Sequence, residues 1–453
     1  MYCVSIILLL GLLSGCTNSL NNESTANQAP NHSESRPAQT DETAAEEPAE
    51  DVAKEPVELT IWFTSSVPQS DEAFDEMYRN LIEAKFPHIT LHFLPYNSEN
   101  TFQNLIVTNQ PIDLIVSSIG QTAGFVLAHD LHYDISELIK QHDYDLSLVE
   151  PSTIEIQRQI SGGGIYGLPM STDTMTLFYN RDLFDLFGAA YPPDGLTWED
   201  TYEIIQRMSR TEDGVHYWGM GISPNHALQL DPLSPPFIDE QNKAAFENER
   251  YKRALETLVQ IFNISGNEVD ASNWSYGTHL SMFQIEKTMA MLLGTSALGY
   301  AYFGDNEDLN WDVAAYPRYA DQPDIGPQTY PVYFYVSSIS KHKDEAFQVA
   351  AYITTKQFQT HLAGYGVLPI SSDPTVMDHY GNLLPYMADK NIDAFLPNTF
   401  APPSYKGEFH SIGVSASQEA FRKVVLKETD INTALREAVE MAEQLIAERL
   451  GSN

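Results

Sequence analysis

Cysteine is almost absent from this sequence: its 453 residues include two, Cys3 and Cys16, both near the beginning of the chain. Because the rest of the chain holds no thiol, a disulfide framework, a cysteine nucleophile and a cysteine-ligated metal site are excluded there. The folded part therefore has to be stabilised by its hydrophobic cores alone. A chain of this length normally buries enough apolar surface for a full core in each of two domains.

Basic residues are also scarce: 25 Lys and Arg stand against 62 Asp and Glu, which gives a formal net charge of −37. Residues 17–56 hold nine acids and two bases, so about −30 of that charge belongs to the rest of the chain. Nucleic acid and anionic lipid surfaces would repel such a protein, which speaks against both as partners. We interpret the acidity as a solubility surface for a salty or alkaline medium; an acidic cleft for cationic ligands remains the alternative.

Long hydrophobic runs are missing, and the clearest apolar segment covers residues 4–13. About ten residues are too few for a membrane-spanning helix, which needs about 20, but they suit the core of a secretory signal. The next four residues, Leu13-Ser14-Gly15-Cys16, resemble a lipobox, in which the cysteine receives diacylglycerol. No Lys or Arg precedes the run, which departs from the usual signal. We expect residues 1–15 to be a lipoprotein signal peptide and Cys16 to be lipidated, which places the chain on the extracellular face of the cell membrane. An ordinary cleaved signal and a membrane anchor are the alternatives.

Large apolar side chains are rare in residues 17–56, where Asn, Ser, Thr, Ala, Pro and Glu dominate. Such a composition cannot bury enough surface to fold, so residues 16–56 are predicted to be the lipidated cysteine and a disordered acidic tether. A flexible coil of this length has its ends roughly 35 Å apart. The tether would hold a folded body off a membrane and near a partner embedded in it.

From residue 57 onward, strand and helix patterns alternate. The strands are expected at residues 58–63, 89–93 and 112–116, and the last is a continuous apolar run of the kind buried in a parallel sheet. Helical spacing starts at Ser70, ends at Pro87 and returns near Phe102. Five alternating elements in about 60 residues predict an α/β lobe. Ligands of such sheets bind at the carboxyl ends of strands, which here are residues 63–65 and 117–121.

Two elements in the middle of the chain carry the strongest signal of the body. Residues 164–169 read Gly-Ile-Tyr-Gly-Leu-Pro, and residues 176–184 read Thr-Leu-Phe-Tyr-Asn-Arg-Asp-Leu-Phe. Here the chain resembles the family 1 extracellular solute-binding proteins, which serve importers of the ATP-binding cassette (ABC) class. The resemblance runs from about residue 57 to the C-terminus and continues through residues 192–193, 196–200, 283–291, 311–317 and 364–369. Glu286 stands where the family usually has glycine.

The resemblance implies a fold of two α/β lobes joined by crossing strands, with the ligand in the cleft between them. The N-lobe would comprise residues 57–171 with 330–366, and the C-lobe residues 172–329 with 367–453. Closure around a ligand would present a surface to the permease subunits of the importer. The same resemblance implies a monomer that binds a small-molecule solute, catalyses no reaction and touches the membrane only through its lipid.

Competing motifs are weak. Residues 162–167 satisfy G-x-G-x-x-G, but a dinucleotide site must open a helix, and Leu168-Pro169 predicts an extended crossing instead. The Lys-Ser/Thr pair of a phosphate-binding P-loop is missing. Thirteen histidines include no H-E-x-x-H, so no metal or cofactor is expected. Paired carboxylates could suit a glycosidase, but among 62 acids a pair is found almost anywhere, and no nucleophile motif accompanies them.

The aromatic residues point to sugar, because sugar sites combine flat rings with amides, hydroxyls and carboxylates. The 24 tyrosines supply both a ring and a polar group. The candidate ligand-binding residues lie at strand ends, on expected crossings and in loops: Trp62, Phe63, Thr64, Ser65, Ser118, Gln121, Thr172, Asp173, Trp274, Gly294, Tyr330, Tyr333, Tyr365, Phe409 and His410. Most aromatic residues could equally be packing residues, and Trp198, which opens an amphipathic helix, is expected to fill core.

Two departures bear on specificity. Sugar binders of this family often carry Gly-Pro-Trp after the Ala-Met element, whereas residues 294–296 read Gly-Thr-Ser. Phe409-His410 stands where an aromatic platform is common. The sequence thus predicts a receptor that delivers a carbohydrate, expected to be an oligosaccharide, to an ABC importer. A binding protein for a polyamine, peptide or metal complex and a surface-anchored polysaccharide-active enzyme remain the alternatives.

Overall fold

The computed structural model describes residues 54–451, apart from 65–67, 69, 305 and 398. Lys54–Asn453 forms one compact unit, and its described hydrophobic clusters draw only on residues 57–446. The expected signal peptide, Cys16 and nearly all of the expected tether lie outside the described residues.

The first sheet confirms the strand and helix order expected for the beginning of the body. Its order is β2-β1-β3-β10-β4. β1 pairs in parallel with β2 and β3, whereas β10 is antiparallel to both β3 and β4. The sheet is therefore mixed, and β3 begins two residues later than expected. The bounds are β1 Val57–Phe63, β2 Ile89–Leu94, β3 Leu114–Ser118, β4 Gly167–Ser171 and β10 Val332–Val336.

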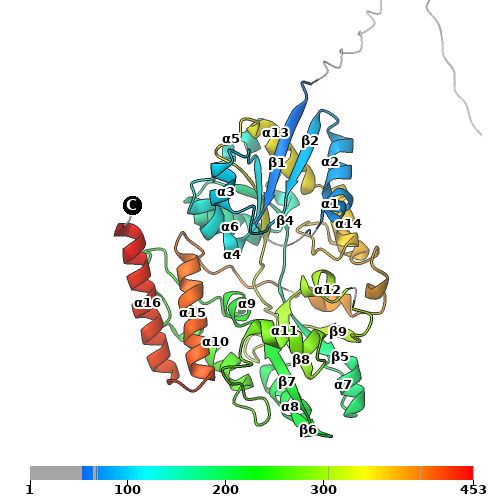
Figure 1. Cartoon of the computed structure of the whole chain (residues 1–453), viewed down its shortest axis with the longest axis vertical. Coiled ribbons are helices and arrows are strands. Elements are labelled where there is room, and N and C mark those ends of the chain that lie inside the picture. The colour runs from blue at the N-terminus through cyan, green and yellow to red at the C-terminus, as the bar shows by residue number, and fades with distance from the viewer. Residues whose placement is uncertain (1–53, 65–67, 69, 305, 398, 452–453) are drawn as a thin grey trace, which may run out of the picture. The chain divides into compact units, whose positions relative to one another are not determined.

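Helices surround this sheet (Figure 1). The expected helix after Ser70 forms, with the Ser70 side chain accepting a hydrogen bond from the Ala73 backbone as its N-cap. It contains a π-helical turn, Asp75–Arg79. The helices are α1 Asp71–Phe74, α2 Asn80–Lys85, α3 Phe102–Val107, α4 Ile119–Thr122, α5 Ser136–Gln141, α6 Pro151–Ser161, α13 Lys343–Ile353 and α14 Lys356–Gly364, with a second π-helical turn at Ala123–Leu127 and a 3-10 turn at Leu146–Leu148.

The glycine-rich segment after α6 is not a helix start. Gly162 ends α6 in the left-handed conformation, with φ of 68°, and Gly167 begins β4. The extended crossing expected from Leu168-Pro169 is therefore confirmed. A dinucleotide site that opens a helix has no place here.

The second sheet has the order β6-β7-β8-β5-β9. Its bounds are β5 Met175–Asn180, β6 Arg210–Glu212, β7 Val215–Ile222, β8 Met289–Thr295 and β9 Trp311–Ala314. β7 and β8 run parallel, so their carboxyl ends lie at one edge of this sheet. The helices around it are α7 Arg181–Leu186, α8 Trp198–Met208, α9 Pro224–Gln229, α10 Glu249–Ile261, α11 Tyr276–Gln284, α12 Leu298–Ala301, α15 His410–Val425 and α16 Ile431–Gly451, with 3-10 turns at Pro374–His379, Pro385–Met387 and Ile392–Phe395.

Each sheet is the centre of one lobe, and the largest hydrophobic cluster takes residues from both sheets. The cluster around the first sheet includes Leu59, Phe63 and Phe334. The largest cluster packs the second sheet against α8, α10, α15 and α16 and extends to Trp62. Trp198 opens α8 behind a capping box formed by Thr197 and Asp200 and is buried, as expected for a core residue. The predicted residue boundaries between the lobes stay a prediction.

Three segments cross between the two sheets. β4 leads into β5 through residues 172–174, where Thr172 N donates to Leu368 O at 3.1 Å. Asp173 N donates to Tyr330 O at 3.0 Å, and Tyr330 N donates to Asp173 O at 2.8 Å. The crossing segments are thus bonded to one another between the lobes.

Among the residues that the structure describes, no helix combines the length and apolarity that a membrane crossing requires. The described His, Cys, Asp and Glu side chains also form no group of three or more that could hold a metal ion.

Candidate ligand-binding cleft

A cavity of about 370 Å³ lies where the two lobes face each other. The first sheet contributes the carboxyl end of β3 with the start of α4, the end of β4 and the start of β10. The second lobe contributes α9 and the chain that follows β8. Its lining is Met77, Tyr78, Val116, Ser118, Gly120, Gln121, Met170, Ser171, Asp173, Asn225, His226, Gln229, Thr295, Ala297, Tyr300, Ala301, Tyr302, Tyr330, Val332, Val367 and Val414.

Asp173 is the carboxylate of this cavity. Ser296 Oγ donates to its Oδ1 at 2.9 Å, and the same Ser296 oxygen accepts from Thr174 N at 3.2 Å. Burial raises the pKa of Asp173 to about 7, although the hydrogen bonds from Ser296 and from the Ala297 backbone act in the opposite direction. The carboxyl group therefore exchanges its proton close to neutral pH while it faces the cavity.

Tyrosine rings form much of the remaining wall. Tyr78, Tyr300, Tyr302 and Tyr330 all line the cavity, and Tyr330 Oη lies 3.4 Å from Ser118 Oγ, which donates to it. Burial raises the pKa values of Tyr300 and Tyr330, and the Asp173 carboxylate adds to the shift in both. These hydroxyls therefore stay protonated at neutral pH and can each donate a hydrogen bond to a ligand.

The short helix α9 supplies a histidine and two amides. Ser223 Oγ and His226 Nδ1 are 2.8 Å apart, and the His226 ring meets Tyr330 edge-on at 5.4 Å. Burial lowers the pKa of His226 to about 4, so its ring is neutral at pH 7. Behind it, Gln229 accepts from His410 Nε2 at 2.9 Å.

Residues of the first lobe fix the opposite wall. Thr64 Oγ1 lies 3.2 Å from Gln121 Oε1 and 3.0 Å from Ser117 Oγ, so the end of β1 positions the Gln121 amide. Gly120 has no room for a side chain, because a Cβ there would collide with the Tyr330 hydroxyl. A glycine at this position lets Tyr330 approach α4.

The structure brings four of the expected site residues into this cavity, namely Ser118, Gln121, Asp173 and Tyr330. Thr64, Thr172 and Gly294 lie next to cavity residues without lining it. Trp274 borders a neighbouring cavity of about 260 Å³ that shares Asn225 and His226 with the first. Ser65 lies outside the described residues.

Six expected residues lie elsewhere. Trp62 and Phe63 are fully buried: Trp62 packs against Phe102 and Phe125, and Phe63 packs against Phe74 and Phe93. Because alternate residues of a buried strand point into two cores, the aromatic pair at the end of β1 fills both.

The other four expected residues also pack in the protein interior or against its core. Tyr333 is buried and donates to Thr153 O at 2.7 Å, and Tyr365 packs on the core of the first lobe. Phe409 and His410 are buried at the start of α15. His410 reaches the cavity only through Gln229.

The sequence prediction missed Asn225, His226 and Gln229 as well as Tyr300 and Tyr302. One signal could have found them. The rule that ligands bind at the carboxyl ends of parallel strands predicts a site after β1 and β3, and it holds equally for β7 and β8. The first three residues follow β7, and the two tyrosines follow β8.

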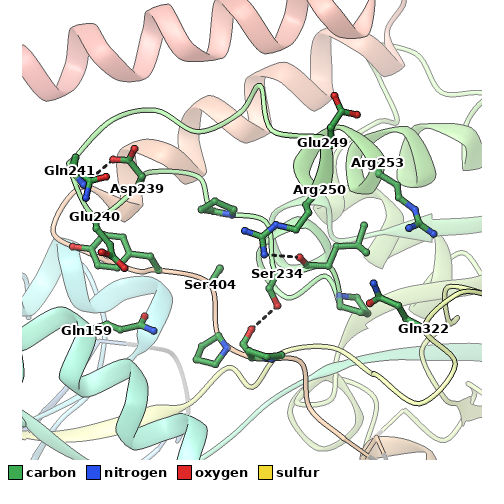
Figure 2. A pocket seen from close by; sticks show the side chains of 16 residues that line it. Gln159, Ser234, Asp239, Glu240, Gln241, Glu249, Arg250, Arg253, Gln322 and Ser404 are labelled. Atoms are coloured by element: carbon green, nitrogen blue, oxygen red, sulfur yellow. Dashed lines mark hydrogen bonds between the residues drawn. The ribbon is translucent and has the colours of Figure 1, made fainter.

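Two other cavities are larger. One, of about 730 Å³, lies among Gln159 of α6, the loops before α10 and residues 402–405 (Figure 2). Its lining mixes Asp239, Glu240 and Glu249 with Arg250 and Arg253. The other, of about 800 Å³, lies at the amino-terminal ends of the first sheet's strands. The 730 Å³ cavity also draws on both lobes but has a single tyrosine, Tyr405, and the 800 Å³ cavity has none. Four tyrosines line the cavity of Asp173, which is therefore the candidate site.

Solved structures share this architecture. An ABC substrate-binding protein from Listeria monocytogenes in complex with cycloalternan aligns with a TM-score of 0.70 at 19% identity, covering 87% of this chain and 100% of its own. UgpB from Mycobacterium tuberculosis in complex with glycerophosphocholine gives 0.67 at 14% identity, with 88% and 100% covered. The GacH receptor of Streptomyces glaucescens, studied unliganded and with acarbose, gives 0.63 at 16% identity, with 86% and 99% covered. At these identities the likeness shows the two-lobed fold.

Sequence comparison gives the family. A protein of Brucella abortus described as a binding protein is 23% identical over 401 residues, covering 82% of this chain and 89% of its own length. The family model of the bacterial extracellular solute-binding proteins matches residues 65–360, which is more than half of the sequence. The chain therefore belongs to the family of bacterial extracellular solute-binding proteins.

Proposed function

We propose that this protein captures a carbohydrate between its two lobes and delivers it to an ABC importer. The observation that carries the proposal is the lining of the cleft. Four tyrosines stand there beside the hydroxyl, amide and carboxyl groups of Ser118, Gln121, Asn225 and Asp173. Rings that stack on C–H faces and polar groups that bond hydroxyls are the two things that a sugar site requires.

The neighbours support this choice, since two of those described above are named with cycloalternan and acarbose. Another, from Agrobacterium vitis, is named with bound D-mannitol. An importer as partner follows from the same group, because several are named as ABC substrate-binding or solute-binding proteins. Capture works as a population shift, because a ligand that touches both lobes favours their closed arrangement.

The cleft by itself is small, and the cavity beside it supplies the additional room that an oligosaccharide needs. The 370 Å³ of the cleft lies near the lower end of the range of about 300–1,000 Å³ that is usual for ligand pockets. The adjoining 260 Å³ cavity shares Asn225 and His226 and ends at Trp274. We propose that a second or third sugar ring extends into it and stacks on Trp274.

A thermal-shift screen of Lys54–Asn453 against mono- and oligosaccharides, a polyamine and a peptide tests the function. A ligand that binds only the folded state raises the melting temperature with concentration. We expect the rise with one class of sugar, which is recovered chemically intact; a cleaved sugar would indicate an enzyme instead. Tyr302→Ala is the matched variant, because Tyr302 lines the cleft yet is 47% exposed, so its loss should weaken binding without unfolding the lobe.

We also propose lipid attachment at Cys16 after removal of residues 1–15. Metabolic labelling with a fatty acid tests it in the full chain. The wild type should take up label and sediment with membranes, whereas Cys16→Ser should do neither. Label retained in the Cys16→Ser variant would contradict the proposal.

A further inference from the structure

The cleft has an acidic side chain that no basic side chain of its described lining balances. Of its described lining residues, Asp173 is the single acid, and Lys and Arg do not occur among them. The histidine of the lining, His226, is neutral at pH 7 because burial lowers its pKa to about 4. One carboxylate thus stands in an otherwise uncharged cavity.

The Asp173 carboxylate accepts hydrogen bonds, but no cation of the described chain is paired with it. Its polar contacts are the Ser296 hydroxyl at 2.9 Å and the Ala297 backbone. The charged form of a buried group is strongly disfavoured without an opposite charge. In the described chain, no cation contributes to the pKa of Asp173, and burial alone dominates it. The position therefore favours a ligand that brings the missing positive charge.

Tyrosine side chains line the cavity together with the same carboxylate. They are Tyr78, Tyr300, Tyr302 and Tyr330, and the charge of Asp173 helps to raise the pKa of the Tyr300 and Tyr330 hydroxyls. Tyrosine rings attract cations through their faces, and this attraction is stronger where water is excluded. A carboxylate among tyrosine rings is a site for a protonated amine.

We infer that the carbohydrate taken by this cleft is an amino sugar with a free amine, whose ammonium group pairs with the Asp173 carboxylate among these tyrosines. The inference rests on the proposed carbohydrate function and narrows its substrate class. Hydroxyls of the same sugar bond Gln121, Ser118 and Asn225. An N-acetylated or neutral sugar of the same length keeps those bonds and loses the ion pair.

The test compares three ligands of known chemistry by calorimetry, using residues 17–453: a glucosamine oligomer, its N-acetylated counterpart of equal length, and spermidine. We expect the free-amine sugar to bind at least about tenfold more tightly than the N-acetylated one, because the partner of a buried charge is lost. Equal or tighter binding of the N-acetylated sugar would overturn the amino-sugar inference and leave the carbohydrate function standing. Binding of spermidine alone, or of none of the three together with a failed sugar screen, would overturn both.

The variant Asp173→Asn provides a second test. Asparagine has the shape of aspartate, and its side-chain oxygen can still accept the hydrogen bond from Ser296. The substitution should reduce affinity for the free-amine sugar about tenfold or more and leave affinity for a neutral sugar nearly unchanged. Gln121→Ala is the control: it removes an uncharged lining group and should weaken both sugars equally. If Asp173→Asn weakens both sugars equally as well, Asp173 bonds a hydroxyl and the inference fails.

Discussion

Asp173 and Tyr330 bond to each other through their backbones in both directions, at 3.0 Å and 2.8 Å, where two chain segments cross between the lobes. The same two residues point a carboxylate and a phenol ring into one cavity. A change that displaces Tyr330 therefore disturbs both the crossing and the cleft.

The variant Gly120→Ala, in the first lobe, should displace Tyr330. A Cβ at Gly120 would overlap the Tyr330 hydroxyl, and overpacking of this kind costs about 1–3 kcal/mol. We expect the free energy of unfolding in urea to fall by that amount and the dissociation constant of the ligand to rise about tenfold.

Gly124→Ala is the matched control for this variant. Gly124 lies four residues further along the same helical stretch, and a Cβ there meets nothing within 4 Å. It should leave affinity unchanged. If both variants bind like the wild type, Tyr330 does not position the ligand.

The protonation of Asp173 predicts a pH dependence of stability. Burial raises its pKa in the folded state to about 7 from the ordinary 3.8, so the folded protein binds this proton more readily than the unfolded chain does. The contribution of Asp173 to stability therefore falls as the pH rises from about 4 through 7. Asp173→Asn should be about 1–3 kcal/mol more stable than the wild type at pH 8 and nearly equal to it at pH 4. Urea unfolding at both pH values measures this; a pH-independent difference would contradict it.

The fold could be predicted largely from the sequence because its signals are local. Ser70 and Pro87 bound the first long helix, and alternation or apolar runs mark β1, β2 and β3. The lobe pairing required the family resemblance, since β10 joins the first sheet from more than 200 residues beyond β3. No local sequence pattern predicts that β10 inserts antiparallel between β3 and β4.

The site was harder to predict because aromatic residues serve packing and binding alike. Trp62 lies near the end of one apolar strand and Tyr330 just before another, yet Trp62 is fully buried and Tyr330 faces the cavity. The difference depends on which core the neighbouring helices fill, which is a tertiary property. Asp173 stood out because a carboxylate on a crossing has no packing role; its contact with a ligand stays a prediction.

Lys406 should act on stability with the opposite sign to Asp173. Its amine is buried beside Ser404 Oγ at 2.9 Å and Gln328 Oε1 at 3.3 Å, and burial lowers its pKa to about 7 from 10.5. The unfolded chain binds this proton more readily, so stability should rise as the pH increases from 7 towards 10.5, by up to about 1.4 kcal/mol per pH unit.

Lys406→Met should remove this rise of stability with pH, because methionine fills a similar volume and has no titratable group. Unfolding in urea at pH 7, 8 and 9 measures the slope in both proteins. Lys243→Met is the control, since Lys243 is exposed. An unchanged slope in Lys406→Met would show that the amine is solvated in the folded state.

We expect Trp274 to distinguish long from short ligands. Trp274 is half-buried and lines the cavity beside the main cleft, and the two cavities share Asn225 and His226. A ligand confined to the main cleft does not reach it, whereas a longer one stacks on its ring, an interaction of about 0.5–1.5 kcal/mol beyond its buried area. Trp274→Ala should therefore weaken binding of a trisaccharide about tenfold and leave a monosaccharide unaffected, as measured by calorimetry on the same protein. Trp274→Phe keeps a ring and should restore most of the loss. Equal weakening of both ligands would place Trp274 in the support of α9 rather than in contact with sugar, and no weakening of either would confine the ligand to the main cleft.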